Sequence, residues 1–500
     1  MYFSIFKSYI KMKKNILFFS RCELAYLYGN LDKYLTDKYN TIHIAYSDEE
    51  YKILCDNFQI KNIIHFKNEL RKITNKELAE ANIEEIDSFL LETTLGHFNI
   101  NGALLANRTS LYLTYEENLR LIKIYYFFWK NLFLSYKIDF FVHEPVSLLM
   151  NQFAACFCNK YKAIYSTHIL LTGEIENHFS FTMVDGYNGE PTSLYKHYNA
   201  ITSKELKDNK ERIETFLEKT RKKLNILFAQ LSSGKISLKK YYLLNLKSHY
   251  STIKKKLSPL SFDPIIDNID LFIYKDNFLN KRVRNLKSYR GIIFEDLDTT
   301  KEYYYYPMHL EPEAVVLYWA NNRYTNQIKL IENIASQLPP NTFLYVKDHP
   351  HLVGYRNVED YKRLKAIPNV RLLKTSISGK QVIYHSKGVI TINGTGGFEA
   401  LLLNKQVITF GNSFYRVCKR VHYLDNVFDL RDLLYSLKEV SYEDDEELYR
   451  FTLAYLKNLL PGFTNFFDNM HQKLHINLDE NAKIVANSLD KWITFISSDE

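Results

Sequence analysis

The stretch ITINGTGGFEA, residues 390–400, decides the fold. Apolar and β-branched residues lead to Asn393, a glycine-rich segment follows, and apolar residues resume at Phe398. This order predicts a buried strand over 388–393, a tight turn, and a helix over 398–403. Backbone N–H groups and the positive end of such a helix form an anion site. The pattern is neither GxGxxG nor a Walker loop, and the alternative is a turn that binds nothing.

Short apolar runs and helical stretches alternate on both sides of this turn. Further strands are predicted over 16–20, 41–46, 62–66, 140–143, 163–166, 303–306, 342–346, 370–374 and 406–410. Helices are predicted over 76–93, 115–136, 326–337 and 378–385. The strands lack strict polar and apolar alternation, as expected when both faces of a parallel sheet are covered. We therefore predict an α/β protein with two Rossmann-like halves facing a cleft, where ligands bind beyond the carboxyl ends of the strands.

Composition limits the classes of protein that this chain can represent. The 500 residues are 46% hydrophobic and 24% charged, as in a globular chain, and 15% aromatic content argues against disorder. Residues 201–290 carry a net charge of +12 and the rest of the chain −4, which together make the overall +8. A general nucleic-acid binder, with positive charge over most of its surface, is therefore not expected.

Four segments are predicted, and the charge marks one of them. They are a Rossmann-like domain over 1–203, a basic helical insertion or linker over 204–290, a second Rossmann-like domain over 291–470, and a helical segment over 471–500 that packs back on the first domain. Helices are expected over 205–228 and 237–257, with lysine clusters at 239–240 and 254–256. The stretch 221–256 either rests on an anionic membrane or is an exposed helical hairpin.

The chain shows no sign of export or of a membrane span. The five cysteines are scattered, without zinc spacing or a disulfide framework, so we expect a cytoplasmic protein. The first 20 residues lack the pattern of a signal peptide. The most apolar segment, 121–142, is interrupted by Lys123, Lys130 and Lys137 on one helix face. That face is either solvated or lies on a membrane.

Three further motifs follow predicted strands. In KDHP, residues 347–350, the proline keeps His349 out of helical geometry, so the imidazole either reaches a ligand phosphate or is structural. In PMHLEPE, residues 307–313, the two carboxylates either act as base or nucleophile or belong to a capped loop. In the first half, Glu144 either serves as acid or base or caps the next helix.

These motifs, taken in order, resemble the bacterial capsule polysaccharide synthesis family, which includes ulosonic-acid (Kdo) transferases with Gln-Pro-type and His-Pro motifs. The resemblance rests on PMHLEPE, on YVKDHP at 345–350, and on HSKGVITINGTGGFEALLLNKQVITFGNSFY at 385–415. It is weaker over 138–167, and it does not cover 204–290. It implies a metal-independent GT-B glycosyltransferase without a cofactor. The C-terminal domain would hold a nucleotide sugar, with CMP-Kdo or a related CMP-ulosonic acid favoured, and the N-terminal domain would face a glycan or lipid-linked acceptor.

The resemblance also implies roles for individual residues. His349 would bind the donor phosphate, and Glu399 the ribose. Glu313 would be the nucleophile, and Glu144 the acid or base. The other donor-side residues would be Lys347, Pro350, Ser386, Asn393, Thr395, Gly396 and Gly397. His309 and Glu311 would either contact the acceptor or support the motif. The Kdo branch has glutamine and aspartate at the places of His309 and Glu313.

Three functions remain as hypotheses from the sequence. The first is a glycosyltransferase that builds capsule or another surface glycan, in the cytoplasm or peripherally on the inner face of the membrane. The second is a nucleotide-sugar epimerase, which also uses two Rossmann-like halves. The third is a non-catalytic glycan- or lipid-binding component of an export complex. No metal site is expected, because Asp444-Asp445 lies in an acidic run and no histidine cluster occurs.

Overall fold

The computed structural model describes residues 13–169, 174–175, 178–222, 263–267, 294–311, 313–349, 356–437, 446–466 and 469–498. The helix predicted over 237–257, both lysine clusters, Pro350 and Asp444-Asp445 lie outside these residues. So does most of the stretch 221–256.

The first sheet takes strands from both ends of the chain. Its strands are β1 (Asn15–Ser20), β2 (Asn40–Ala45), β3 (Ile63–His65), β4 (Phe140–His143), β5 (Ile164–Ile169), β6 (Glu174–Ile175), β7 (His178–Asp185) and β14 (Leu460–Pro461). The order is β14-β7-β5-β4-β1-β2-β3, with β6 paired to β7. Strands β1 to β5 are parallel, whereas β7 runs antiparallel to β5 and β14 antiparallel to β7.

The second sheet is parallel throughout and is built from residues 303–423. Its strands are β8 (Tyr303–Pro307), β9 (Phe343–Lys347), β10 (Val370–Leu373), β11 (Gly388–Thr391), β12 (Gln406–Thr409) and β13 (Val421–Tyr423). The order is β10-β9-β8-β11-β12-β13.

Both sheets follow the same winding. In each, the first strand lies between the second and the fourth, so the strand order reverses beside β1 in one sheet and beside β8 in the other. This is the Rossmann order, and ligands bind at the carboxyl ends of the strands where the order reverses. The predicted α/β class with two Rossmann-like halves is confirmed.

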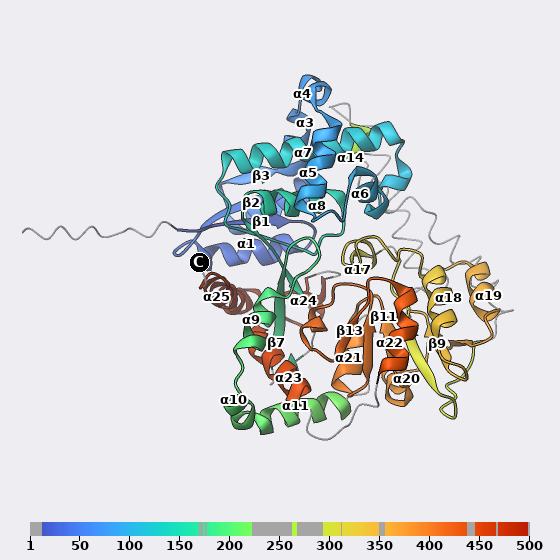
Figure 1. Cartoon of the computed structure of the whole chain (residues 1–500). Coiled ribbons are helices and arrows are strands. Elements are labelled where there is room, and N and C mark those ends of the chain that lie inside the picture. The colour runs from blue at the N-terminus through green and yellow to red at the C-terminus, as the bar shows by residue number, and fades with distance from the viewer. Residues whose placement is uncertain are drawn as a thin grey trace, which may run out of the picture.

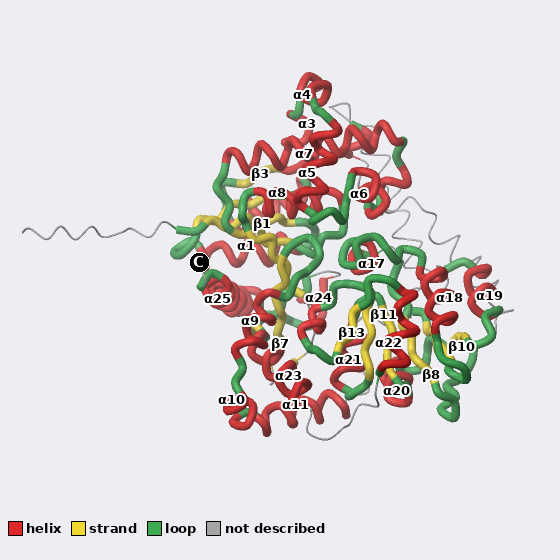
Figure 2. Tube along the Cα trace, viewed as in Figure 1, coloured by secondary structure: helices red, strands yellow, loops and turns green. Residues whose placement is uncertain are grey.

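Helices cover both sheets (Figures 1 and 2). In the first half they are α1 (Leu24–Leu35), α2 (Asp48–Lys52), η1 (Ile53–Asn57), α3 (Phe66–Lys72), α4 (Asn75–Glu80), α5 (Ile83–Thr93), α6 (Ile100–Ala106), η2 (Ser110–Tyr112), α7 (Tyr115–Ser135), α8 (Leu149–Lys160) and α9 (Thr192–Ala200). Then come α10 (Ser203–Asp208), α11 (Lys210–Lys222) and α14 (Pro264–Asp267). The second half has α17 (Ala314–Leu317), α18 (Gln327–Gln337), α19 (Val358–Lys365), α20 (Gly379–His385), α21 (Thr395–Leu402), η5 (Phe414–Val417), η6 (Val427–Asp429) and α22 (Leu430–Ser436). The chain ends with α23 (Glu446–Asn458), α24 (Met470–Lys473) and α25 (Leu478–Ile496).

Alternating side chains of each buried strand enter different cores, as the period of a strand requires. In β8, Tyr303 and Tyr305 pack towards α20, α21 and α23, whereas Tyr304 and Tyr306 pack towards α18 and α19. The absence of polar alternation in these strands reflects this two-sided burial.

Three helix predictions were wrong in their bounds. Within the described residues, the helix predicted over 205–228 is split at Asn209 into α10 and α11. The helix predicted over 76–93 is split into α4 and α5, because the Asn82 side chain accepts a hydrogen bond from the Glu84 N–H and starts a new helix. The helix predicted over 398–403 begins earlier, at Thr395, so Gly396 and Gly397 lie in its first turn. Strands β6, β7, β13 and β14 were not predicted.

The segments outside the two sheets attach to both halves. Leu206, Ile213 and Leu217 of α10 and α11 pack into the core that also holds α21 and α23, so this part of the basic stretch lies against the C-terminal half. Strand β14 pairs with β7 although it precedes residue 470, the predicted end of the second domain. Helix α25 packs beside α1 in the first half (Figure 1).

Candidate active site

His309 joins two motifs at the point where the strand order of the second sheet reverses. It follows β8, and its Nε2 lies 3.1 Å from Oγ1 of Thr391, the last residue of β11. The same nitrogen lies 3.4 Å from the backbone nitrogen of Asn393. Burial lowers the pKa of His309 to about 4, and the charge of His349 adds to this effect. A neutral imidazole therefore connects PMHLEPE to the glycine turn.

The glycine turn fits closely between its neighbours. Gly394 caps α21 with φ 93°, and a Cβ there would lie 2.9 Å from Cε1 of His309. A Cβ on Gly397 would collide with the hydroxyl of Tyr415, which donates to the Gly394 carbonyl over 2.9 Å. Thr395 is exposed and Gly396 is half-exposed. The first turn of α21 is thus held from one side and open on the other, as an anion site requires.

Two residues that the sequence did not single out hold the motif loops in place. The Gln327 side chain accepts from the His309 N–H at 2.8 Å and donates to the His309 carbonyl at 3.1 Å and to Oε1 of Glu311 at 2.6 Å. Arg356 reaches Oε2 of Glu311 at 2.6 Å and Oδ2 of Asp348 at 3.1 Å. Glu311 therefore supports the loop and does not stand free for catalysis. Neither Gln327 nor Arg356 was identified from the sequence, because neither belongs to a motif.

The KDHP motif is brought to the same edge. Lys347 is the last residue of β9 and is buried. Burial lowers its pKa, and the negative charges of Asp348 and Glu399 oppose this effect. Burial raises the pKa of Glu399 to about 7, against Lys380 and Lys347. His349 is half-buried, and its backbone N–H donates to Oδ1 of Asp348 over 2.8 Å. Lys347 at the end of β9 therefore lies near Glu399 of α21.

Glu313 reaches the junction of the two halves because of the helix that follows it. Leu317, Tyr318 and Trp319 of α17 and its C-terminal end pack into the core of the first half, where Phe98 and Tyr318 have ring centroids 5.9 Å apart (Figure 1). Burial raises the pKa of Glu313 to about 7, and the positive charge of Arg108 opposes this effect. Glu313 is thus a carboxylate of the C-terminal half under the influence of an arginine of the N-terminal half.

Glu144 lies where the strand order of the first sheet reverses, and it is paired. Arg21, which follows β1, holds it through Nε at 2.6 Å and Nη2 at 3.1 Å. Burial alone would raise the pKa of Glu144, but Arg21, and then His143, bring it below its ordinary value. The alternative that Glu144 caps the next helix is not observed, because Leu148 is the N-cap of α8 and the first N–H of the helix, that of Leu149, donates to Oδ1 of Asn107.

Arg108 connects the two catalytic candidates. Its Nε donates to the Ser147 carbonyl at 3.2 Å, and its guanidinium interacts electrostatically with both Glu144 and Glu313. Sequence reasoning missed Arg108 and Arg21, since isolated arginines carry no pattern.

Ser386 was wrongly assigned to the donor side. It precedes β11, and its hydroxyl donates to the Ile383 carbonyl over 2.8 Å. Because β11 is parallel to its neighbours, its amino end lies at the opposite edge of the sheet from the glycine turn.

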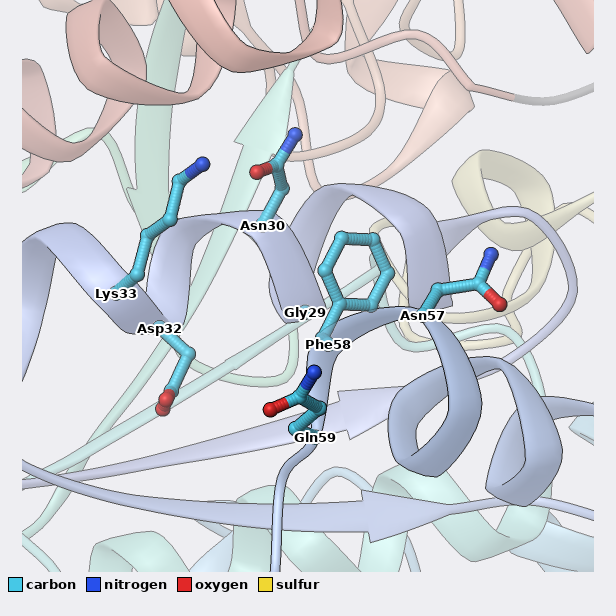
Figure 3. A pocket seen from close by; sticks show the side chains of 7 residues that line it. All are labelled: Gly29, Asn30, Asp32, Lys33, Asn57, Phe58 and Gln59. Atoms are coloured by element: carbon cyan, nitrogen blue, oxygen red, sulfur yellow. The ribbon is translucent and has the colours of Figure 1, made fainter.

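A pocket on the first half lies apart from these residues. It is lined by Gly29, Asn30, Asp32, Lys33, Asn57, Phe58 and Gln59, from α1, the last residue of η1 and the segment after it (Figure 3). None of the predicted site residues lines it.

Two structural features bear on cofactor and membrane. Within the described ranges, no group of three His, Cys, Asp or Glu side chains is arranged to hold a metal ion. Among the helices of the same ranges, none combines the length and apolar character needed to cross a bilayer.

Part of this chain resembles a curated protein. A curated relative, Protein FixF of Sinorhizobium fredii (strain NBRC 101917 / NGR234), is 30% identical over 151 residues, which are 29% of this chain. The matched part is 34% of FixF, so the chain spans about a third of the length of that relative.

Solved structures resemble the chain only slightly. The beta Kdo 2,4 transferase of Thermosulfurimonas dismutans KpsC is 13% identical, over 63% of this chain and 79% of that one, with a TM-score of 0.29. The beta Kdo 2,7 transferase of the same KpsC is 17% identical, over 43% and 65%, with a TM-score of 0.24. The UDP-GlcNAc 2-epimerase of Neisseria meningitidis is 10% identical, over 96% and 100%, with a TM-score of 0.22. At TM-scores this low, the likenesses carry no argument about activity.

The family comparison concerns the part of the chain that holds the motifs. The family described as "Capsule polysaccharide biosynthesis protein" matches residues 271–418, which include PMHLEPE, KDHP and the glycine turn. The resemblance to the capsule polysaccharide synthesis family is thereby confirmed over these residues.

Proposed function

We propose that the protein is a metal-independent GT-B glycosyltransferase that transfers a sugar from a nucleotide sugar to a capsule or other surface-glycan acceptor. The observation that carries the proposal is that the carboxyl edges of the first and the second sheet meet at Arg108. This arginine acts on Glu144 of the first half and on Glu313 of the second. The match of residues 271–418 to the capsule family supports the same activity.

The donor would lie against the C-terminal half. The open first turn of α21 and the half-buried His349 would take the donor phosphate, and Glu399 the ribose. As the glycosidic bond breaks, negative charge grows on the departing nucleotide. A helix N-terminus and a nearby imidazole N–H stabilise that charge without moving, which lowers the barrier. CMP-Kdo or a related CMP-ulosonic acid is the favoured donor, on the resemblance of the motifs.

The two carboxylates would divide the chemistry. The Glu313 carboxylate attacks the anomeric carbon, and the bond from that carbon to the donor phosphate breaks. The acceptor hydroxyl then attacks the same carbon and displaces Glu313, while Glu144 takes the hydroxyl proton. The low pKa of Glu144 keeps it ionised and able to accept. This work would take place at the cytoplasmic face of the membrane, with the basic stretch 221–256 towards the lipid.

Ligand binding and product formation together test the proposal. Thermal unfolding of the full chain would be followed with CMP, UDP, GDP and their sugars, since a ligand of the native state raises the melting temperature. CMP and CMP-sugars are expected to raise it most, and a glycan acceptor to receive the sugar. Turnover of a nucleotide sugar without acceptor would indicate an epimerase. No shift with any nucleotide would indicate a non-catalytic component and overturn the proposal.

A further inference from the structure

Buried polar groups without partners gather at the carboxyl edge of the first sheet. In the described part of the chain, the hydroxyls of Ser20, Ser147 and Thr167 and both amide atoms of Gln152 have no hydrogen-bond partner. They belong to the end of β1, to the second half of β5, to the loop after β4 and to the first turn of α8. A buried polar group left unpaired costs about 1–3 kcal/mol, so such a concentration is typical of a site shaped for a ligand.

The same edge has a surplus of positive charge. Arg21 is neutralised by Glu144, but no carboxylate of the described residues lies at ion-pair distance from Arg108. Burial, together with the charge of Arg21, lowers the pKa of Arg108. An enclosed guanidinium without a counter-ion is costly, and the cost is relieved when an anion binds.

Helix α8 adds to the positive potential. It has 12 residues, begins after β4 at this edge, and has no acidic residue in its first turn. The neutral Asn107 side chain accepts from the N–H of Leu149, the first residue of the helix, over 3.3 Å. Its N-terminus therefore contributes a partial positive charge that no residue of that turn compensates.

We propose that Arg108, supported by Arg21 and the start of α8, binds the carboxylate of an acidic sugar substrate beside Glu313. The inference rests on the proposed function and names the chemical class of its substrate. The guanidinium fork matches a carboxylate in two parallel hydrogen bonds. Since Arg108 also interacts with Glu313, the bound carboxylate lies next to the reacting carbon, as it does when the carboxylate is attached to the anomeric carbon itself.

Matched ligands test this selectivity. Dissociation constants of the full chain would be measured for a CMP-ulosonic acid and for its analogue with a carboxamide in place of the carboxylate. A second pair, a simple glycoside of the same acid and its carboxamide, distinguishes an acidic acceptor from an acidic donor. The wild type should prefer the carboxylate of at least one pair by about 10- to 100-fold. Arg108→Gln should reduce that preference to less than about 3-fold and leave the affinity for CMP unchanged.

Two controls keep the result interpretable. Arg120→Gln also removes a positive charge from the first half, but that arginine is paired with Asp263, so the preference should persist. Without ligand, Arg108→Gln should melt within a few degrees of the wild type, because Arg108 forms no close ion pair with a described carboxylate and loses one hydrogen bond, to the Ser147 carbonyl. A preference that survives in Arg108→Gln, or no preference in the wild type, overturns the inference. If none of CMP, UDP and GDP or their sugars binds, the proposed function fails, and the glycoside pair still decides whether Arg108 selects a carboxylate.

Discussion

Gln327 and Gln152 are both fully buried, one at the carboxyl edge of each sheet, but only Gln327 uses its amide within the protein. Gln327 bonds to His309 and Glu311, whereas neither amide atom of Gln152 has a partner among the described residues. The contrast extends to the arginines. Arg356 is bound by two carboxylates of its own half, and Arg108 by none at ion-pair distance in the described chain.

The difference indicates that the two carboxyl edges recognise their ligands in different ways. In the C-terminal half, the motif side chains of His309, Glu311 and Asp348 mostly position loops, and the open first turn of α21 remains for a ligand. In the N-terminal half, the polar side-chain atoms of Ser20, Ser147, Thr167 and Gln152 remain unpaired among the described residues. We infer that the C-terminal edge recognises a ligand largely through backbone and helix end, and the N-terminal edge largely through side chains.

The largest effect is expected where the two edges meet. Glu313→Gln should lower the rate of transfer by about 1,000-fold or more, because an amide cannot act as the nucleophile. The melting temperature should stay within a few degrees of the wild type, since the amide keeps the shape and removes a buried charge. Transfer assays and thermal unfolding of the same preparation would check both.

A matched exchange and a pH profile sharpen this test. Glu302→Gln removes an exposed carboxylate paired with Lys387 and should leave transfer unchanged. The pKa of Glu313 is raised to about 7, and a nucleophile must be ionised. The rate of the wild type should therefore rise as the pH increases from about 6 to 8. A rate that falls over this range would mean that Glu313 acts in its protonated form.

The next effect concerns the arginine of the C-terminal edge. Arg356→Met leaves Glu311 and the buried Asp348 without their cation and should cost about 3 to 5 kcal/mol in the free energy of unfolding. Denaturant titration measures the loss. The exposed pair of Arg363 with Glu332 supplies the control, and Arg363→Met should cost no more than about 1 kcal/mol. Equal costs for the two variants would contradict the assigned role of Arg356.

The two glutamines offer a direct comparison of the edges. Gln327→Met leaves buried hydrogen-bonding groups of His309 and Glu311 without a partner. It should lower the free energy of unfolding by about 2 to 4 kcal/mol. Gln152→Met removes only unpaired atoms and should change it by less than about 0.5 kcal/mol or raise it. Both values come from denaturant titration without ligand. If Gln152→Met destabilises as strongly as Gln327→Met, the N-terminal edge is not left unpaired for a ligand.

The smallest expected effect separates backbone conformation from close packing. Gly394 and Gly96 both have positive φ, but a Cβ on Gly394 meets His309 while a Cβ on Gly96 meets nothing within 4 Å. Gly96→Ala should cost about 1 kcal/mol, and Gly394→Ala about 1 to 3 kcal/mol more. Thermal unfolding of the two variants measures the difference. Equal losses would show that His309 does not constrain the turn.

Much of the fold was predictable because strands that are buried on both faces are visible in the sequence as continuous apolar runs. The strands that became β1, β4, β8 and β12 read as continuous apolar runs, and each is covered on both faces. The break at Asn82 and the return of the chain through β14 were missed. The Asn82 cap was missed because it interrupts a helical pattern over only a few residues. Strand β14 was missed because two residues are too few to show the alternation of a strand.

The candidate site was predictable only where motif and strand end coincide. His309, Lys347, His349 and Asn393 do lie at the edge that their position after a strand indicated. Ser386 does not, because the direction of β11 puts it at the other end of the sheet. Arg21, Arg108, Gln327 and Arg356 could not be found, since each acts on a residue distant in sequence or outside every motif.

The sequence by itself determined the two Rossmann-like halves, the glycine turn and the resemblance to the capsule family, because local patterning and turn chemistry specify these features. Only the tertiary structure decided which groups are paired. Packing of α17 into the first half brings Glu313 under the influence of Arg108, and burial then sets the pKa of that carboxyl. Ionisation and pairing depend on neighbours that the order of residues does not reveal.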